Sequence, residues 1–254
     1  FHADTGLGQR AGQPRMGKAL ARAGAEQHDL GLPRQQPRVG VVAAACAIPT
    51  LLIAGLTAAL QAMGVRILRQ GMRWHVAGLG TCGLLAPDAP LHFSASSTAL
   101  RLCLGLAAAQ GIAPACTGDA TLSARSQAGL LAALATFGAV PDDAARQRLP
   151  LQLRTARLPM PIELVLPTPS AQLKAAVLLG ALALPGFSAV TEPLATDSSI
   201  EQVLRSFGAR LEVSGTEAGR RVEIEGLPLL RARHVAIPGD LTLAATIVVA
   251  EGAN

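Results

Sequence analysis

Three segments of this 254-residue chain repeat one pattern, and this repetition constrains the fold more than any other feature of the sequence. Each segment is an amphipathic helix that ends in a bulky residue and a glycine, followed by a β-rich run. The glycines are Gly64, Gly138 and Gly208, which lie 74 and 70 positions apart. A glycine at this place permits the positive φ that ends a helix, and the bulky residue before it can pack back on the helix.

Strand patterns follow these helix ends. Val65 to Ile67 and Leu211 to Val213 alternate as half-buried strands do, and Arg73 to Val76 and Arg220 to Glu225 are their expected hairpin partners. The second segment continues into the strand-like run LPLQLRT. The sequence therefore predicts an α/β domain built from three units of about 70 residues, each with helices and a small sheet.

Two further helices are expected between these marks. One covers Thr98 to Gln110, with Ser96 or Ser97 as its N-cap, and the other covers Ser170 to Leu182 and ends at Pro185-Gly186. Small residues at a helix start leave the backbone N–H groups accessible, so each start is a candidate anion site.

At the helix near Thr98, Arg101 also adds positive charge in the first turn. An ordinary serine-capped helix explains the same residues. Likewise, residues 118–125 (GDATLSAR) could be a turn with a solvated Arg125, and residues 170–172 could be a plain helix cap. Each motif taken singly leaves both interpretations open.

The run from Gly78 to Gly83 matches the dinucleotide fingerprint G-x-G-x-x-G after an expected strand. That motif works only where a helix begins at once, so that the helix N-terminus can hold the pyrophosphate. Here the chain continues into LLAPDAPL, whose two prolines oppose a helix, and Cys103 stands where an acidic residue is needed. We therefore expect no nicotinamide site.

The chain is basic, with a net charge of +5 and a pI near 9.7, and the basic excess lies in the first 150 residues. A modest positive field suits small anions such as phosphates and carboxylates. Nucleic acid is the alternative, but aromatic residues make up 2% of the chain and no Lys/Arg cluster is present. The cysteines and histidines lack metal-ligand spacing, so no metal site is expected.

The apolar run from Val41 to Leu60 is long enough to cross a bilayer. It is rich in alanine and has Pro49 and Thr50 in its middle, so a strand, a turn and a helix fit better than a membrane span. Residues 1–40 have weak periodicity and are expected to be poorly ordered or non-native. We interpret the chain as a fragment, in which residues 41–237 form the three-unit domain and residues 238–254 begin a second, truncated domain.

Taken together and in order, several motifs resemble 5-enolpyruvylshikimate-3-phosphate synthase over roughly residues 55–254. The motifs are LGTCGLLAPDAPL, STALRLCLGLAA, GDATLSAR, PTPSAQLKAAVLLGALALPG, TEPLATDSSIEQVLRSFGA and IPGDLTLAA. The resemblance implies a two-domain α/β protein, each domain made of βαβαββ-type units around a pseudo-threefold axis. It also implies transfer of the enolpyruvyl group of phosphoenolpyruvate to shikimate 3-phosphate in aromatic amino-acid biosynthesis.

The resemblance further implies site residues. Shikimate 3-phosphate would bind at Ser170, Ala171 and Gln172, and phosphoenolpyruvate at Arg125 beside the helix start formed by Ser97, Thr98 and Arg101. Catalytic residues are not assigned in this chain, because the proton-transferring groups would belong to the second domain. No metal or organic cofactor and no nucleic-acid or membrane partner is implied, and a cytoplasmic monomer is expected.

Some positions depart from the family pattern. The usual Gly-Asn-Ala-Gly-Thr loop reads Ser-Ala-Ser-Ser-Thr at residues 94–98, so Ala95 replaces the asparagine. Asp197 stands about where an arginine or tyrosine is expected near the phosphate, and the early Lys-Ser…Arg signature is not recognisable. A degenerate relative that binds an anion or nothing is therefore the alternative. Transfer to a nucleotide sugar is a second enzymatic alternative, which the Ser-Ala-Gln and Gly-Asp motifs disfavour.

Overall fold

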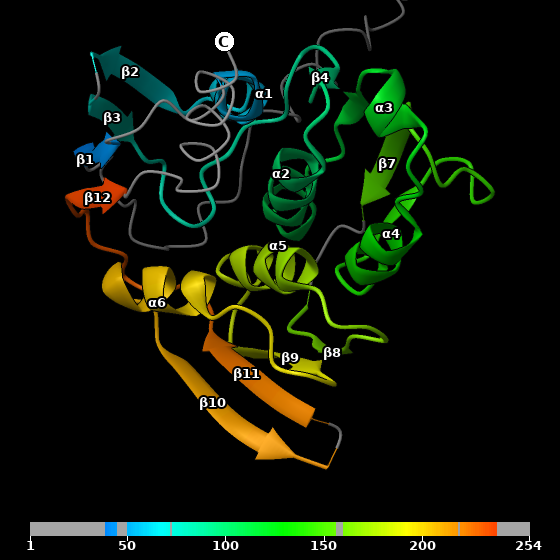
Figure 1. The fold of residues 1–254 in the computed structure, drawn as a ribbon, viewed down its shortest axis with the longest axis vertical. Helices are drawn as coiled ribbons and strands as arrows, with labels where there is room; N and C mark the ends of the chain where they lie inside the picture. The colour runs from blue at the N-terminus through cyan, green and yellow to red at the C-terminus, as the bar shows by residue number, and fades with distance from the viewer. Residues whose placement is uncertain (1–38, 45–49, 72, 156–159, 218, 238–254) are drawn as a thin grey trace, which may run out of the picture. The chain divides into compact units, whose positions relative to one another are not determined.

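The computed structural model describes residues 39–44, 50–71, 73–155, 160–217 and 219–237, all within a unit of residues 36–254 (Figure 1). The helices in these residues are α1 (Thr50–Ala62), α2 (Ser97–Ala109), α3 (Ala120–Ser123), α4 (Ala128–Ala135), α5 (Ala171–Ala181) and α6 (Ser199–Ser206). The strands are β1 (Val39–Ala44), β2 (Arg66–Gln70), β3 (Arg73–Ala77), β4 (Leu91–His92), β5 (Ala115–Thr117), β6 (Ala139–Pro141), β7 (Leu151–Thr155), β8 (Glu163–Val165), β9 (Phe187–Glu192), β10 (Leu211–Thr216), β11 (Gly219–Glu225) and β12 (Val235–Ile237).

The strands form three sheets that share one pairing pattern. Their strand orders are β12-β1-β3-β2, β4-β5-β7-β6 and β8-β9-β11-β10. In each order the first two strands are parallel and the later pairs are antiparallel. Each of the edge strands β2, β6 and β10 follows directly on a helix, as the sequence pattern predicts. The predicted α/β class with small sheets is confirmed, and the structure shows that the sheets are mixed.

The three repeat glycines end helices as expected. Gly64, Gly138 and Gly208 have φ values of +93°, +78° and +101°, a backbone conformation that side chains disfavour. The bulky residues before the first two, Met63 and Phe137, are fully buried. These positions therefore confirm the prediction that each helix turns back through a glycine into an edge strand.

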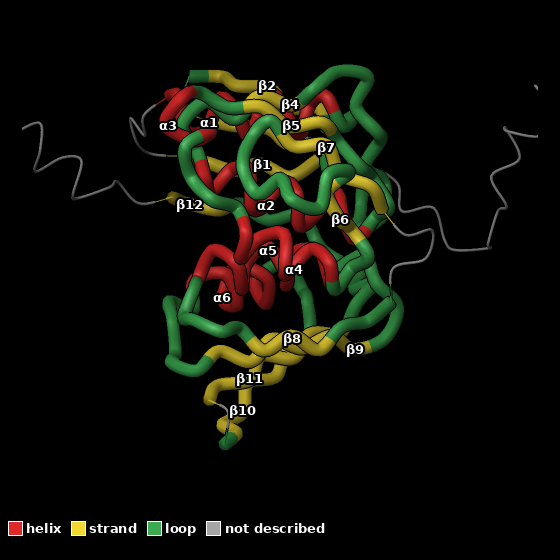
Figure 2. The backbone as a smooth tube through the Cα atoms, turned by 90° about the vertical axis from the view of Figure 1, so that its right-hand side faces the viewer, coloured by secondary structure: helices red, strands yellow, loops and turns green. Residues whose placement is uncertain are grey.

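The helices pack together and form the core. Figure 2 shows α4, α5 and α6 between the sheet of β8 to β11 and the remaining strands. One cluster of buried apolar side chains joins residues of α1, α2, α4, α5 and α6 with residues of the sheets. The largest fully buried apolar side chains in it are Phe93, Phe137, Met63, Leu100, Leu104, Leu122, Leu130, Leu134, Leu151, Leu153 and Leu178.

The closest helix pair is α2 and α5, whose backbones touch. A Cβ built on Gly105 of α2 would lie 2.2 Å from the carbonyl oxygen of Ala176 in α5. A Cβ on Gly180 of α5 would lie 2.7 Å from the carbonyl oxygen of Gly105. Glycine is therefore required at both crossing points, because any side chain would push the two helices apart.

The structure also bears on the dinucleotide motif and on the apolar run near the start of the domain. Residues 78–90 contain no helix, so the dinucleotide motif is excluded. The apolar run at 41–60 contributes the strand β1 and the helix α1, and in the described part of the chain no helix is long and apolar enough to span a bilayer. Strand β1 begins at Val39, two residues before the expected start of the domain. Residues 1–38 and 238–254 lie outside the described residues.

Gly105→Ala should lower the free energy of unfolding by about 3 kcal/mol, the upper end of typical overpacking costs, because the new methyl group meets backbone rather than a flexible side chain. Gly129→Ala in α4 is the control: its Cβ would contact one Leu173 methyl carbon at 3.5 Å. That change should stabilise the protein by about 0.5–1 kcal/mol through helix propensity. Urea denaturation measures both, and equal effects would contradict the close-approach argument.

Candidate anion-binding site at two helix N-termini

The site is built on the N-termini of α2 and α5, each capped by a serine. The Ser96 hydroxyl accepts a hydrogen bond from the Ala99 backbone N–H at 3.1 Å, and the Ser170 hydroxyl accepts one from the Leu173 N–H at 3.3 Å. Ser96 is therefore the N-cap among the two serines considered. Each hydroxyl satisfies one N–H group of the first turn, and the Ser170 hydroxyl keeps its own hydrogen for donation.

Three predicted site residues meet between these helices. Gln172 in the first turn of α5 donates from Nε2 to the Thr98 Oγ1 at 2.9 Å. Arg101, one turn further along α2, donates from Nη1 to the Oε1 of the same amide. The α2–α5 crossing thus places Thr98, Arg101 and Gln172 in one hydrogen-bonded chain.

Arg125 adds a second guanidinium to this region. Burial lowers the pKa of Arg101, and the nearby positive charge of Arg125 lowers it further. The Arg101 Nε is buried and has no hydrogen-bond partner among the described residues, and neither arginine forms an ion pair there. Two guanidinium groups without a carboxylate create a positive field that favours a phosphate or carboxylate ligand.

The Gly-Asp turn at Gly118 and Asp119 precedes Arg125 and fixes the local backbone beside the loop before α2. The Asp119 carboxylate caps α3 by accepting from the Leu122 N–H at 2.8 Å, and the Asp119 N–H donates to the Ser94 carbonyl at 3.0 Å. A Cβ on Gly118 would lie 2.8 Å from a Leu122 methyl carbon, so this position has little room for a side chain. Arg125 follows α3 and is exposed.

The other two predicted residues, Ser97 and Ala171, are the first residues of α2 and α5. Both are partly buried. They lie beside the capping serines, and the Ser97 hydroxyl makes no hydrogen bond in the described structure. Their small size leaves the helix N-termini accessible.

A buried charge cluster next to α5 was not predicted from the sequence. It consists of Lys174, Glu192, Glu201 and Arg220, with Lys174, Glu192 and Glu201 almost fully buried. The Lys174 Nζ lies 3.0 Å from Glu192 Oε1 and 2.8 Å from Glu201 Oε1. Arg220 lies 2.7 Å from Glu192 Oε1 and 2.6 Å from Glu201 Oε2. Two cations and two anions therefore balance in the interior.

The buried charge cluster ties the loop between β9 and α6 to α5. Lys174 donates to the Asp197 carbonyl at 3.0 Å, and the Thr196 hydroxyl donates to Glu192 Oε2 at 2.6 Å. Lys174 lies one turn after Ser170 on the same helix. The cluster therefore fixes this loop close to the start of α5.

The Asp197 carboxylate is turned toward α6. It accepts from the Ser199 N–H at 2.9 Å and from the Ser199 hydroxyl at 2.8 Å. These Ser199 hydrogen bonds, with a smaller contribution from Lys174, hold the Asp197 pKa below its usual value. The negative charge that the sequence comparison placed near a phosphate is thus engaged at the N-terminus of α6, where a helix favours an anion.

One sequence signal could have revealed the cluster. Lys174 is the only charged residue in the predicted helix from Ser170 to Leu182, whose other positions are mostly apolar. A single lysine in so apolar a helix indicates a buried charge that needs carboxylate partners. The partners themselves come from β9, α6 and β11, which only the tertiary fold brings together.

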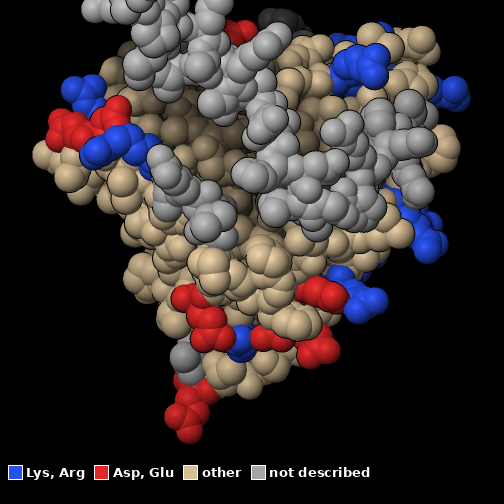
Figure 3. Space-filling view, turned by 180° about the vertical axis from the view of Figure 1, so that it is seen from behind, with Lys and Arg blue, Asp and Glu red and all other residues tan. Residues whose placement is uncertain are grey.

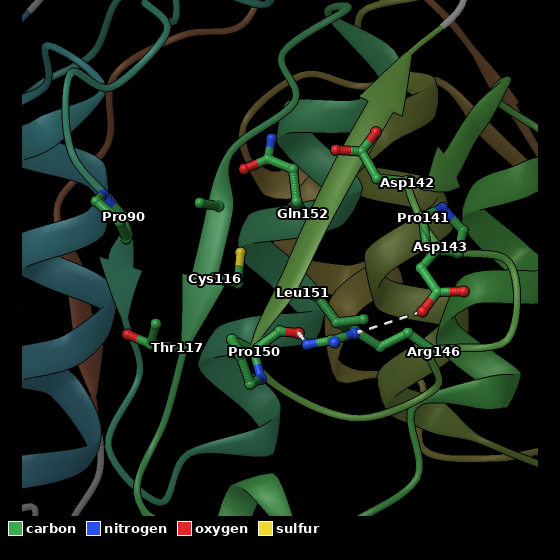
Figure 4. A pocket seen from close by; sticks show the side chains of 11 residues that line it. Pro90, Cys116, Thr117, Pro141, Asp142, Asp143, Arg146, Pro150, Leu151 and Gln152 are labelled. Atoms are coloured by element: carbon green, nitrogen blue, oxygen red, sulfur yellow. Dashed lines mark hydrogen bonds and ion pairs between the residues drawn. The ribbon is translucent and has the colours of Figure 1, made fainter.

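A separate cavity of about 380 Å³ lies against the sheet of β4 to β7 (Figure 4). None of the predicted site residues lines it. Arg146 on its wall already donates to the Pro150 carbonyl at 3.2 Å and lies 3.9 Å from Asp143. Its other walls include Pro90, Cys116 and Leu151. A mostly apolar cavity whose arginine is already paired is a poorer anion site than the α2–α5 region.

Charges are unevenly distributed on the surface, as the sequence indicates. In Figure 3 acidic side chains gather at the lower end, where the β10–β11 hairpin lies, and most of the basic ones lie higher. The acidic end includes the exposed Glu163 and Glu212.

The described residues form an α/β protein with a candidate small-anion site where the N-termini of α2 and α5 converge. A family model for EPSP synthase (3-phosphoshikimate 1-carboxyvinyltransferase) matches residues 53–252. The chain therefore belongs to the EPSP synthase family, whose named members are transferases.

Individual relatives agree with this assignment. The chain is 43% identical over 196 residues to the 3-phosphoshikimate 1-carboxyvinyltransferase of Novosphingobium aromaticivorans, covering 76% of this chain and 44% of the relative. It is 39% identical over 193 residues to that of Rhizobium johnstonii, covering 76% and 43%. The EPSP synthase structure from Acinetobacter baumannii superposes with a TM-score of 0.72 at 28% identity, covering 82% and 46%. The chain thus spans less than half the length of these relatives.

Arg220→Met should lower the free energy of unfolding by about 3–5 kcal/mol, because it leaves two buried carboxylates with Lys174 as their only cation. Arg221→Met, the next residue on the opposite face of β11, is the matched control. Its partners Glu163 and Glu223 are more exposed, so the cost should be about 0–1 kcal/mol. Chemical denaturation of both variants decides this, and similar losses would show that the cluster contributes no more than a surface pair.

Acid should destabilise the protein through Glu192 and Glu201. Burial alone would raise each pKa, but hydrogen bonds from Lys174 and Arg220, joined at Glu192 by one from Thr196, outweigh it, so both folded-state values lie below the usual 4.5. The stability they contribute is present above about pH 4.5 and is lost as the pH falls through the lower folded-state values.

Each of these carboxyls should add a slope of roughly 1.4 kcal/mol per pH unit to the unfolding free energy in that acid range. Glu201→Gln should reduce the slope, while Glu212→Gln, at an exposed position of β10, should leave it unchanged. Urea denaturation between pH 3 and pH 6 measures the slope. An unchanged slope in Glu201→Gln would contradict the assignment.

Proposed function

We propose that this chain forms the shikimate 3-phosphate half of the site for enolpyruvyl transfer. In that reaction the 5-hydroxyl of shikimate 3-phosphate attacks C2 of phosphoenolpyruvate, and phosphate leaves. Ser170, Ala171 and Gln172 would hold shikimate 3-phosphate. Arg125 would pair with phosphoenolpyruvate beside Ser97 and Thr98 at the start of α2.

The observation that carries this proposal is the arrangement of Gln172 between Thr98 and Arg101, with Arg125 close enough to lower the Arg101 pKa. A hydroxyl, an amide and helix N–H groups are the neutral donors that a polyol phosphate needs. A free guanidinium is suited to a carboxylate or phosphate. Family membership supports the same pair of substrates.

We further propose an architecture for the complete site. Residues 41–237 would form one of two domains, with its three units arranged around a pseudo-threefold axis, and residues 238–254 would begin the other. The groups that transfer protons would come from the second domain as the cleft closes on substrate. The protein would act as a monomer in the cytoplasm and without a metal or organic cofactor.

A degenerate relative that binds an anion without catalysis is the second candidate. Ala95 favours it, because it removes an amide from the loop before α2. Asp197 favours it as well, although the contact with Ser199 draws its carboxylate toward α6. Each lost buried hydrogen bond would weaken ligand binding by about 1–3 kcal/mol, which the fold survives but efficient catalysis does not.

Calorimetric titration of the full chain with shikimate 3-phosphate tests the proposal. We expect micromolar to low-millimolar binding, and Gln172→Ala should weaken it by at least about tenfold through the lost donor. Gln152→Ala, an exposed glutamine of β7 beside the separate cavity, is the matched control and should bind as the unchanged chain does. Absence of heat from a chain shown to be folded by circular dichroism would favour the non-catalytic candidate.

A further inference from the structure

Arg101 does not present its guanidinium freely to the site. The residue is half-buried in the second turn of α2, and its Nη1 is committed to Gln172 Oε1. Arg125, in contrast, is exposed and makes no side-chain hydrogen bond in the described structure. The two arginines of the site therefore have different surroundings and can have different roles.

The contact with Arg101 decides which way the Gln172 amide faces. A threonine hydroxyl can donate or accept, so Thr98 tolerates either orientation of the amide. A guanidinium can only donate hydrogen bonds. It therefore favours the amide orientation in which the acceptor Oε1 faces it and disfavours the orientation in which the donor Nε2 does. Arg101 therefore provides the asymmetry that turns Nε2 toward Thr98.

The fixed orientation determines what Gln172 can offer to a ligand. The Nε2 group has two N–H bonds, of which one is directed at Thr98. The second remains for an acceptor on a bound molecule, while Oε1 is already occupied by Arg101. Gln172 is thus prepared to donate to an oxygen of an anion or polyol and poorly prepared to accept from a ligand hydroxyl.

We propose that Arg101 is a positioning residue that fixes the Gln172 amide as a hydrogen-bond donor toward the bound ligand. The inference deepens the proposed function and rests on it for the identity of the ligand. Arg101 acts through Gln172 without touching the ligand, whereas Arg125 acts on the ligand directly. The site thereby selects for molecules that place an acceptor oxygen at the start of α5.

The orientation of the amide can be tested without any ligand. In the full chain labelled with ¹⁵N, the Gln172 side-chain NH₂ signals are assigned by their loss in Gln172→Ala. Arg101→Met should shift these signals and speed their exchange with water about tenfold, the effect of one lost hydrogen bond. Arg101→Gln, which can donate or accept, replaces it if Arg101→Met does not fold. Unchanged signals would overturn the proposal.

A double-mutant cycle with shikimate 3-phosphate tests the route of action. Arg101→Met should weaken binding about tenfold in the unchanged chain and less than about twofold in the Gln172→Ala background. Arg125→Met is the comparison, measured with phosphoenolpyruvate added. It should weaken binding as much in the Gln172→Ala background as in the unchanged chain. An equal effect of Arg101→Met in both backgrounds would mean that Arg101 contacts the ligand itself, and would overturn the proposal.

Gln172→Glu tests whether Gln172 acts as a hydrogen-bond donor to the ligand. The glutamate keeps the size of the side chain and its contact with Arg101 but has no hydrogen to donate, so binding should fall as far as in Gln172→Ala. Unchanged binding would overturn the donor role. If the unchanged chain fails to bind shikimate 3-phosphate at all, the proposed function is wrong, and the NMR result alone decides the role of Arg101.

Discussion

The approach of α2 to α5 is the constraint on which the site depends. Gly105 and Gly180 let the two backbones touch, and this contact places the first turn of α2 against the first turn of α5. The Thr98 hydroxyl and the Arg101 guanidinium then meet the Gln172 amide across the gap. Because both helices pack in the common core, the same apolar contacts that stabilise the fold also set the geometry of the site.

The buried charge cluster supports α5 from the other side. It connects this helix with β9, α6 and β11, and it reaches the loop at Thr196 and Asp197. Its net charge is zero, and every Lys174 hydrogen has an acceptor, so the cost of burying the ions is largely offset. A well-packed apolar substitute could be as stable, but it would not fix the loop through directional bonds.

Most of the fold could be predicted from the sequence, because glycines mark the helix ends and alternating residues mark the strands. The small residues and serines at the starts of α2 and α5 also indicated where an anion could bind. The partners of Lys174 could not be predicted, since the register that sets Arg220 opposite Glu192 is a tertiary property. The direction of the Arg101 side chain depends likewise on the crossing of two helices 71 residues apart.

Strand β12 pairs in parallel with β1, so that Val235 lies opposite Val42. Among the described strands, β12 is the last to be synthesised, so the sheet that begins first along the chain is completed after the other two. Closing a loop of almost two hundred residues has an entropic cost and slows folding relative to the local hairpins. During synthesis, the other two sheets can therefore form while β1 still lacks its parallel partner strand.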